Sequence, residues 1–283
     1  MGSKLIPTFL GIDGGGSKTR ALLIDANASP ISEGHATGSN PYNIGYAASA
    51  FHIDQAVQDA LFNANPTNIE IASVFCGIAG IRNADEQSQL AKQLKFFSWA
   101  RNARISIDHD LSIAYAAAFE DNPGIALICG TGSSCIGKDP SGNVIWTSGR
   151  HLGEDDPGSG YAIGLAAIQS GLVPQNPSED RKTIAALAPQ VIELATQGNR
   201  IARDILESNV NALVSQVRHV YSKLKLETIF SLGVIGGLGC ADTFYRNLFL
   251  QRLASVFPDA TPRFTNRSPV EAAARLALRQ FSQ

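Results

Sequence analysis

The stretch that decides the fold is FLGIDGGGSKTRALLID, residues Phe9 to Asp25. An apolar run ends in an acidic residue, and a turn of small and polar residues follows: Asp13, Gly14, Gly15, Gly16, Ser17, Lys18 and Thr19. Glycines carry no side chain, so the backbone N–H groups of such a turn can approach an anion closely. We therefore expect a β-hairpin whose turn contacts phosphate.

Two other phosphate-binding motifs are excluded by the residues that follow the turn. A Walker A loop needs Gly-Lys-Ser/Thr and then a helix, but Ser17 separates Gly16 from Lys18. The segment TRALLID is rich in apolar residues and ends in a turn after Asp25, which is typical of a strand. The dinucleotide fingerprint fails for the same reason, because it also requires a helix. Taken alone, the glycines are equally well explained as an ordinary tight turn.

A second turn of the same kind strengthens the phosphate interpretation. The apolar run 125–129 leads into Gly130-Thr131-Gly132-Ser133-Ser134, so the order strand, glycine turn, strand, turn, strand occurs twice. Two such hairpins can hold the phosphates of a nucleotide from two sides. A third glycine cluster, 236–239, lies where a strand gives way to a helix, and close backbone approach there suits an adenosine.

Hydrophobic periodicity and turn residues predict an α/β protein. The expected strands are 7–13, 19–25, 31–36, 69–77, 105–108, 125–129, 135–138, 144–147, 228–235 and 261–264. The expected helices are 44–63, 84–97, 111–119, 161–169, 178–195, 199–226, 241–255 and 269–281.

Composition limits the class of protein. The chain has 283 residues, 44% of them hydrophobic, and a net charge of −2. This length favours about two domains, and the charge provides no basic field for nucleic acid or an anionic membrane. No apolar run reaches the ~20 residues of a membrane span, so we expect a cytoplasmic protein. The four cysteines lack any CxxC spacing and are expected to be reduced thiols: Cys76, Cys129, Cys135 and Cys240.

The ordered set of motifs resembles the N-acetylglucosamine kinase and BadF-type ATPase family of the actin-like (sugar kinase, heat-shock chaperone, actin) superfamily. The resemblance covers nearly the whole chain and depends on DGGGSKT (13–19), GSNP (38–41), GIAG (77–80), Asp110, GTGSS (130–134), DPGSGYAIG (156–164), GGLG (236–239) and SPVEAAA (268–274). It implies two actin-like (ribonuclease H-like) α/β domains with an ATP cleft between them. The first would comprise 1–115, completed by the C-terminal helix 268–283, and the second 116–267.

The resemblance also implies roles for individual residues. Asp13 would hold Mg²⁺ through water, and the turn 14–19 would contact the β- and γ-phosphates of ATP. Thr131, Gly132 and Ser133 would form the second phosphate contact. Gly236 and Gly237 would contact the adenosine. The last helix would pack on the first domain.

Phosphoryl transfer to an alcohol needs a carboxylate near the acceptor hydroxyl. Asp110 matches the catalytic aspartate of the family, one residue before an Ala-rich helix, although it is also a natural N-cap and Asp108 competes for both roles. Asn40 and Asp156 are the expected sugar contacts beside Asp110. Pro157 replaces the usual Glu of the family pattern, and Arg150-His151 replace Trp-Gly, which leaves the sugar open.

The sequence thus favours an ATP-dependent amino-sugar kinase acting on the 6-hydroxyl of N-acetylglucosamine or glucosamine. A kinase for another hexose and a non-catalytic sugar sensor are alternatives. A third is the activator ATPase of a 2-hydroxyacyl-CoA dehydratase system, which needs cluster-ligating cysteines in the second half. Only Cys240 lies beyond Cys135, which argues against that alternative. The sequence leaves the oligomeric state open. The resemblance allows a homodimer, because dimers are common among relatives.

Overall fold

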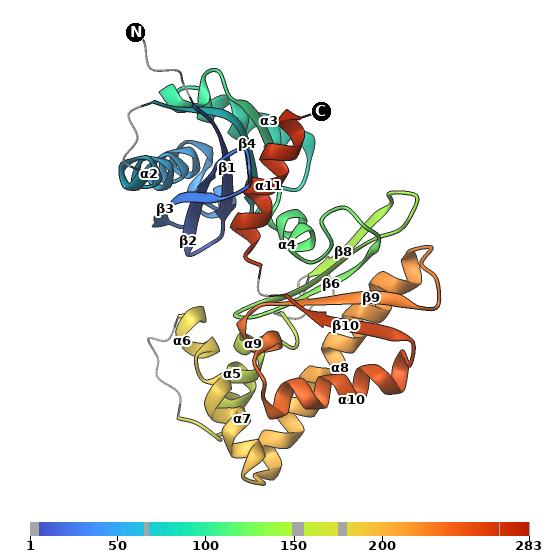
Figure 1. Ribbon diagram of the computed structural model, residues 1–283. Helices are drawn as coiled ribbons and strands as arrows, with labels where there is room; N and C mark the ends of the chain where they lie inside the picture. The colour runs from blue at the N-terminus through green and yellow to red at the C-terminus, as the bar shows by residue number, and fades with distance from the viewer. Residues whose placement is uncertain (1–5, 65–67, 149–155, 175–179, 266, 283) are drawn as a thin grey trace. The chain divides into compact units, whose positions relative to one another are not determined.

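The computed structural model describes residues 6–64, 68–148, 156–174, 180–265 and 267–282 (Figure 1). The chain divides into two compact units. Unit 1 comprises Met1–Ala117 and Arg267–Gln283, and unit 2 comprises Ala118–Asn266. Each unit contains one five-stranded sheet covered by helices.

The sheet of unit 1 has the order β3-β2-β1-β4-β5. β1, β2 and β3 pair antiparallel, and β4 and β5 continue the sheet in parallel to β1. Its elements are β1 (Ile6–Gly14), β2 (Lys18–Ile24), β3 (Pro30–Thr37), α1 (Pro41–Ile44), α2 (Tyr46–Ala64), β4 (Ile69–Ile78), α3 (Ala84–Leu94), the 3-10 helix η1 (Ser98–Ala100), β5 (Arg104–His109), α4 (Asp110–Phe119) and α11 (Pro269–Phe281). The unit boundary falls within α4.

Alternation along β1 explains why helices cover both faces of this sheet. Leu10 and Ile12 belong to a core with α2 and α3, whereas Phe9 belongs to a core with α11. Successive side chains of a strand point to opposite faces, so one apolar run fills both cores. At Gly11 an added Cβ would lie 2.4 Å from the carbonyl oxygen of Val270, so glycine lets α11 contact the strand directly.

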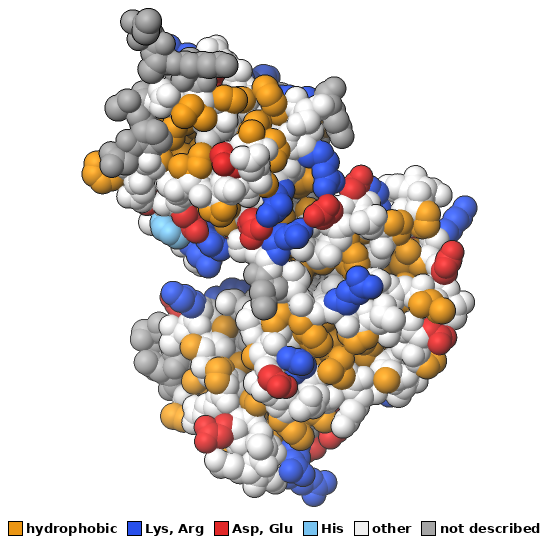
Figure 2. Space-filling view, in the orientation of Figure 1, with side chains coloured by type: hydrophobic (Ala, Val, Ile, Leu, Met, Phe, Trp, Pro, Cys, Tyr) orange, Lys and Arg blue, Asp and Glu red, His pale blue; other side chains and the backbone are white. Residues whose placement is uncertain are grey.

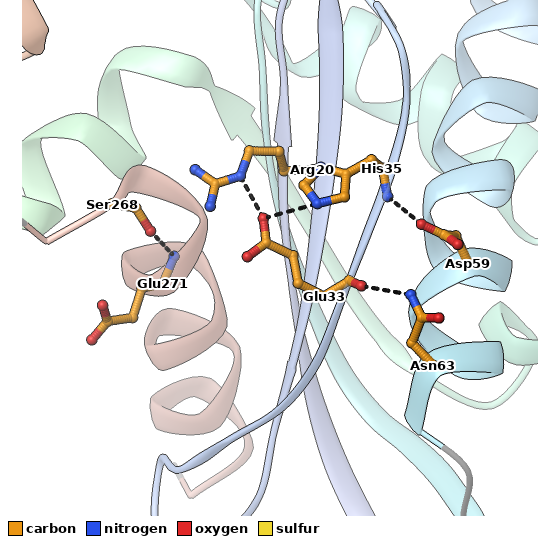
Figure 3. Close-up of polar contacts among 7 residues, drawn as sticks. All are labelled: Arg20, Glu33, His35, Asp59, Asn63, Ser268 and Glu271. Atoms are coloured by element: carbon orange, nitrogen blue, oxygen red, sulfur yellow. Dashed lines mark hydrogen bonds and ion pairs between the residues drawn. The ribbon is translucent and has the colours of Figure 1, made fainter.

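Helix α11 begins with a side-chain cap. Ser268 is the N-cap, and its hydroxyl accepts a hydrogen bond from the backbone N–H of Glu271 at 3.4 Å (Figure 3). Pro269 occupies the first turn, where its missing N–H costs nothing. The helix then buries one face of small residues on the sheet, among them Ala273, Ala274 and Ala277.

The sheet of unit 2 has the order β10-β9-β6-β7-β8. Its elements are β6 (Gly124–Cys129), β7 (Ser133–Lys138), β8 (Val144–Ser148), α5 (Gly160–Gln169), α6 (Arg181–Ala185), α7 (Ala188–Thr196), α8 (Arg200–Lys223), β9 (Phe230–Ile235), α9 (Gly237–Cys240), α10 (Phe244–Val256) and β10 (Ala260–Phe264). One large core joins β6 and β9 to α5, α7, α8 and α10.

The two sheets share one topology. In each, an antiparallel meander of three strands is extended by two parallel strands beside its first strand. The repeat of organisation that the sequence predicts is therefore confirmed, and the α/β fold class with it. Both glycine turns join the first and second strands of a meander.

Three predicted helices differ from those observed. The expected helix 44–63 corresponds to α2, whereas Ile44 ends the separate short helix α1; Gly45, whose φ of 80° lies outside the helical region, divides the two. The expected helix 178–195 is α6 and α7, because Pro189 starts a new helix in its first turn. The expected helix 241–255 begins later, at Phe244, where Thr243 is the N-cap.

The surface carries charges of both signs. On the face drawn in Figure 2, Lys and Arg side chains lie beside Asp and Glu side chains on both units. This mixture agrees with the net charge of −2. Within the described residues, no helix is both long and apolar enough to span a bilayer.

Candidate active site

The first glycine turn, in unit 1, is held in place by backbone hydrogen bonds. The N–H of Gly15 donates to the carbonyl of Lys18 at 2.9 Å, and its own carbonyl accepts from the N–H of Ser39 at 3.0 Å. A Cβ at Gly14 would lie 2.3 Å from Ser39 Oγ, so only glycine fits. Beyond it the turn is open, since a Cβ at Gly16 would meet nothing closer than 3.8 Å. The turn can therefore receive a phosphate on its outer side.

The polar residues after this turn differ in orientation. Ser17 and Lys18 are exposed. Thr19 is buried, and its hydroxyl donates to the carbonyl of Thr37 at 2.7 Å. Of the polar residues in the expected phosphate turn 14–19, Thr19 thus uses its side chain to connect β2 to β3.

Asp13 lies at the carboxyl end of β1, next to the ends of two parallel strands. It pairs in register with Gly77 of β4, which in turn pairs with Asp108 of β5. Ligands of parallel sheets bind at this edge. Burial, and secondarily the negative charge of Asp110, raise the pKa of Asp13 from 3.8 to about 6. The two carboxyl groups are therefore close enough to interact.

Arg20 faces Asp13 across the hairpin and partly offsets this effect. The two residues are register partners, and the guanidinium charge of Arg20 lowers the pKa of Asp13. Arg20 also forms an ion pair with Glu33, whose Oε1 lies 2.6 Å from the Arg20 Nε. The Nε2 of His35 lies 3.7 Å from the same Glu33 oxygen (Figure 3). Burial is the largest cause of the raised pKa of Asp13, so the charge of Arg20 offsets only part of it.

The structure separates the roles of Asp108 and Asp110. Asp108 accepts hydrogen bonds on both oxygens, from the backbone N–H of His109 at 2.7 Å and from the Ser112 hydroxyl at 2.6 Å. It therefore fixes the start of α4. The Asp110 side chain is 35% exposed, and its Oδ1 lies 2.7 Å from Nδ1 of His109. Its carboxylate stays accessible to a ligand, as a base must.

Asn40 is built into the turn that follows β3. Its Oδ1 accepts from the backbone N–H of Tyr42 at 2.9 Å and caps α1. A Cβ at Gly80 would lie 2.2 Å from the same Oδ1, so the GSNP and GIAG motifs pack on each other. The amide Nδ2 remains the group of Asn40 that can donate to a ligand.

The second glycine turn, in unit 2, is braced by the start of α5. The N–H of Gly160 donates to the carbonyl of Gly130 at 2.8 Å, and that of Tyr161 donates to Thr131 at 3.2 Å. Ser133 is buried, and its hydroxyl donates to the carbonyl of Pro157 at 2.8 Å. Thr131 and Gly132 therefore form the accessible part of the turn, whereas the Ser133 side chain faces the core.

The third glycine cluster adjoins this turn and opens onto a cavity. Gly236 has a φ of 101°, and a Cβ there would lie 2.5 Å from the carbonyl oxygen of Cys129. The cavity measures about 600 Å³, and it is lined by Gly130, Thr131, Gly160, Lys182, Ala185, Ala186, Ala188, Pro189, Ile192, Gly237, Leu238, Ala241 and Thr243. It lies wholly within unit 2. Apolar walls with a few polar groups are typical of small-molecule sites.

Asp156 lies beside the second turn. Its Oδ2 would be 2.9 Å from a Cβ at Gly132, and its carboxylate pairs with the guanidinium of Arg181. The neighbouring motif residues Arg150, His151, Glu154 and Asp155 lie outside the described residues.

Sequence reasoning did not find several residues of the cavity and its surroundings. Lys182, Ile192 and Thr243 line it, and Arg181 starts α6. Pro189 could have indicated that the single helix predicted for 178–195 is two helices, because proline is typical of the first turn of a helix. No motif marks Arg181.

The cysteines are arranged as ordinary core residues. Cys76, Cys129 and Cys135 are buried free thiols, and burial raises the pKa of Cys76 and of Cys129 to about 12. Cys240 is partly exposed. Thiols held protonated in this way are poor metal ligands.

Comparison with known proteins finds relatives that are sugar kinases. The chain is 25% identical over 95% of its length to an N-acetyl-D-glucosamine kinase of Dictyostelium discoideum, and the match covers 97% of that protein. It is 28% identical to an N-acetylmuramic acid/N-acetylglucosamine kinase of Clostridium acetobutylicum, over 58% of this chain and 53% of that one. A candidate N-acetylglucosamine kinase of Chromobacterium violaceum has the same fold, with a TM-score of 0.74 at 21% identity over 96% of this chain and 99% of that chain.

A family profile gives the broader assignment. The profile of the BadF/BadG/BcrA/BcrD ATPase family matches residues 10–248, a range that includes the Asp13 turn, Asp110, the second turn and the third glycine cluster. The chain therefore belongs to the BadF/BadG/BcrA/BcrD ATPase family.

Proposed function

We propose that this protein is an ATP-dependent kinase that transfers the γ-phosphoryl group to the 6-hydroxyl of an amino sugar, N-acetylglucosamine or glucosamine. The observation that carries the proposal is the cavity of unit 2, where Gly130, Thr131 and Gly237 line one space of about 600 Å³. A phosphate turn and an adenosine-sized apolar pocket thus adjoin each other. The similarity to two amino-sugar kinases supports the choice of acceptor.

ATP would bind with its adenosine in this cavity and its phosphates at the second turn. Ala188, Ile192 and Leu238 provide apolar contacts for a base, and Thr131 provides a hydroxyl at the phosphate end. The glycine turn of unit 1 would contact the terminal phosphates through its backbone. Because ATP is the co-substrate, we also propose a cytoplasmic location.

Asp13 is the residue we propose for Mg²⁺. The ion would supply positive charge to neutralise the phosphates. The fit is good, because Asp13 and Asp110 are hard oxygen donors whose mutual repulsion a cation would relieve. No cluster of three acidic, His or Cys side chains is arranged for a metal within the described ranges. One or two carboxylates plus substrate phosphates are a usual arrangement for Mg²⁺.

Asp110 is the proposed catalytic base, and Asn40 is the proposed sugar contact. The Asp110 carboxylate would accept the proton of the acceptor hydroxyl as that oxygen attacks the γ-phosphorus. Its contact with His109 orients it, and the hydrogen bonds that Asp108 accepts from His109 and Ser112 leave Asp110 as the available carboxylate. Asn40 Nδ2 would donate to a sugar oxygen.

The test is ADP release from Mg-ATP with N-acetylglucosamine, glucosamine, glucose, N-acetylmannosamine, N-acetylmuramic acid or no sugar. We expect release that depends on an amino sugar and a product phosphorylated at O6 by NMR. 6-Deoxy-N-acetylglucosamine is the matched control, since it lacks the acceptor oxygen and must give no product. ADP release that is equal with and without every sugar would refute the kinase and favour an activator ATPase.

A further inference from the structure

Asp156 has an ion-pair partner, Arg181, that the sequence did not predict. We propose that Asp156 and Arg181 form a neutral pair beside the second glycine turn, and that Arg181 is the positioning residue that makes this turn able to bind phosphate. The proposal rests on the proposed function in one respect, namely that the nucleotide phosphates bind at Gly130–Gly132.

The carboxylate of Asp156 lies directly against that turn. Its Oδ2 is 2.9 Å from the point where a Cβ on Gly132 would be. The backbone on either side of Gly132 is what a phosphate would contact. An isolated carboxylate at this place would repel the ligand that the turn is expected to bind.

The backbone of Asp156 has an unfavourable conformation. Its φ is 50°, a left-handed conformation that is uncommon for residues other than glycine, and Pro157 follows it. The Asp156 carbonyl accepts from the N–H of Ser159 at 3.1 Å. A strained residue that its surroundings hold in place is typical of functional positions.

Buried polar side chains support the next two residues. The carbonyl of Pro157 accepts from Ser133 Oγ at 2.8 Å and from Gln216 Nε2 at 2.9 Å. The N–H of Gly158 donates to Asn209 Oδ1 at 2.9 Å. These contacts fix the direction of the Asp156 carboxylate relative to the second turn, because Ser133 belongs to the strand that leaves it.

Arg181 brings the compensating charge from the element that lines the nucleotide cavity. It is the first residue of α6, pairs with Asp156, and lies over the Tyr161 ring at 4.1 Å. Tyr161 in turn donates its N–H to Thr131 of the turn. Lys182, the next residue of α6, lines the cavity. One guanidinium therefore connects α6, α5 and the acid beside the turn.

The charges predict an unusual pattern among variants. In Arg181→Met the carboxylate of Asp156 loses its partner, so ATP binding weakens. In Asp156→Asn the repulsive charge is removed and Arg181 keeps its positive charge, so ATP binding is retained. The double variant has neither charge and regains binding. Asn also tolerates a positive φ, so Asp156→Asn preserves the backbone.

The experiment measures the affinity of the whole protein for Mg-ATP and for adenosine by calorimetry, and the KM for ATP and sugar. We expect Arg181→Met to weaken ATP binding at least about tenfold while adenosine affinity is unchanged, since only the phosphates meet the carboxylate. Arg181→Lys should retain ATP affinity, and the double variant should return to within about threefold of the parent chain. Exposed residues of α8 provide matched controls, Arg218→Met and Asp204→Asn.

Three results would overturn the proposal. The first is an Asp156→Asn variant that binds ATP as weakly as Arg181→Met, which would show that the charge of the Asp156 carboxylate is not what weakens ATP binding. The second is an equal loss of ATP and adenosine binding in Arg181→Met, which would show damage to α6. The third is a double variant as weak as Arg181→Met. A chain that binds ATP but phosphorylates no sugar would refute the proposed function and leave this test intact.

Discussion

Replacing Asp13 by Asn is expected to stabilise the free protein and to impair its use of Mg-ATP. The reason is the pKa of Asp13, which burial and the charge of Asp110 raise from 3.8 to about 6. The folded protein therefore binds the Asp13 proton more tightly than the unfolded chain does. Stability falls as pH rises from about 4 to about 6, and the full penalty remains at pH 7.

The magnitude follows from the two pKa values. The difference between 3.8 and about 6 corresponds to about 3 kcal/mol at pH 7. Asp13 is only half-buried, and solvent screening reduces the effect, so we expect a gain of about 2 kcal/mol. Asn has nearly the same shape and no charge. The gain should vanish below about pH 4, where Asp13 is protonated in both states.

The assay is urea unfolding of both proteins in EDTA, without nucleotide, followed by circular dichroism from pH 4 to pH 7.5. The Glu70→Gln variant is the matched control, because Glu70 is an exposed carboxylate of β4 in the same unit. Mg-ATP should then stabilise the parent chain more than Asp13→Asn. The reasoning is refuted if Asp13→Asn has the same unfolding free energy as the parent at pH 7, or a difference that does not change with pH.

Four further substitutions test separate parts of the site and the packing of α11. Asp110→Asn should lower kcat by about 10²–10⁴ while calorimetry shows both substrates still binding. Asp108→Asn should chiefly lower thermal stability, because the amide has one acceptor oxygen where the carboxylate uses two, for His109 and Ser112. Ala188→Trp should fill the nucleotide cavity and abolish ADP binding while sugar binding, measured by calorimetry, persists. Gly11→Ala places a methyl group 2.3 Å from the backbone nitrogen of Ala274, so unit 1 should lose α11 packing and become more sensitive to limited proteolysis near the C-terminus.

The sequence was most informative where backbone geometry and residue type coincide. The glycines at 14 and 236 are required by close approaches of 2.3 Å and 2.5 Å, and such positions leave a visible pattern in the chain. The alternation of β1 between two cores is visible for the same reason, since side-chain direction has a period of two.

Long-range pairings were not predictable in the same way. Arg181 is separated from Asp156 by 25 positions and belongs to no recognisable spacing. The burial of the Thr19 and Ser133 hydroxyls depends on which neighbouring carbonyl each reaches, and local sequence does not determine that. Asp108 and Asp110 could be ranked only after their hydrogen-bond partners were known.

Although the two sheets share one topology, the residues at equivalent positions beside the two glycine turns differ in charge. Asp13 is the residue before the end of β1, and its counterpart before the end of β6 is Ile128; both are half-buried at the mouth of a glycine turn. A carboxylate can be useful beside phosphate where a divalent cation neutralises it, but a second one needs its own counter-charge. In unit 2 the strand position is apolar, and the acid that does adjoin the turn, Asp156, is paired with Arg181. Under the proposed function, the neutral second turn would therefore bind polyphosphate without a metal ion of its own, and Asp13 would hold the metal.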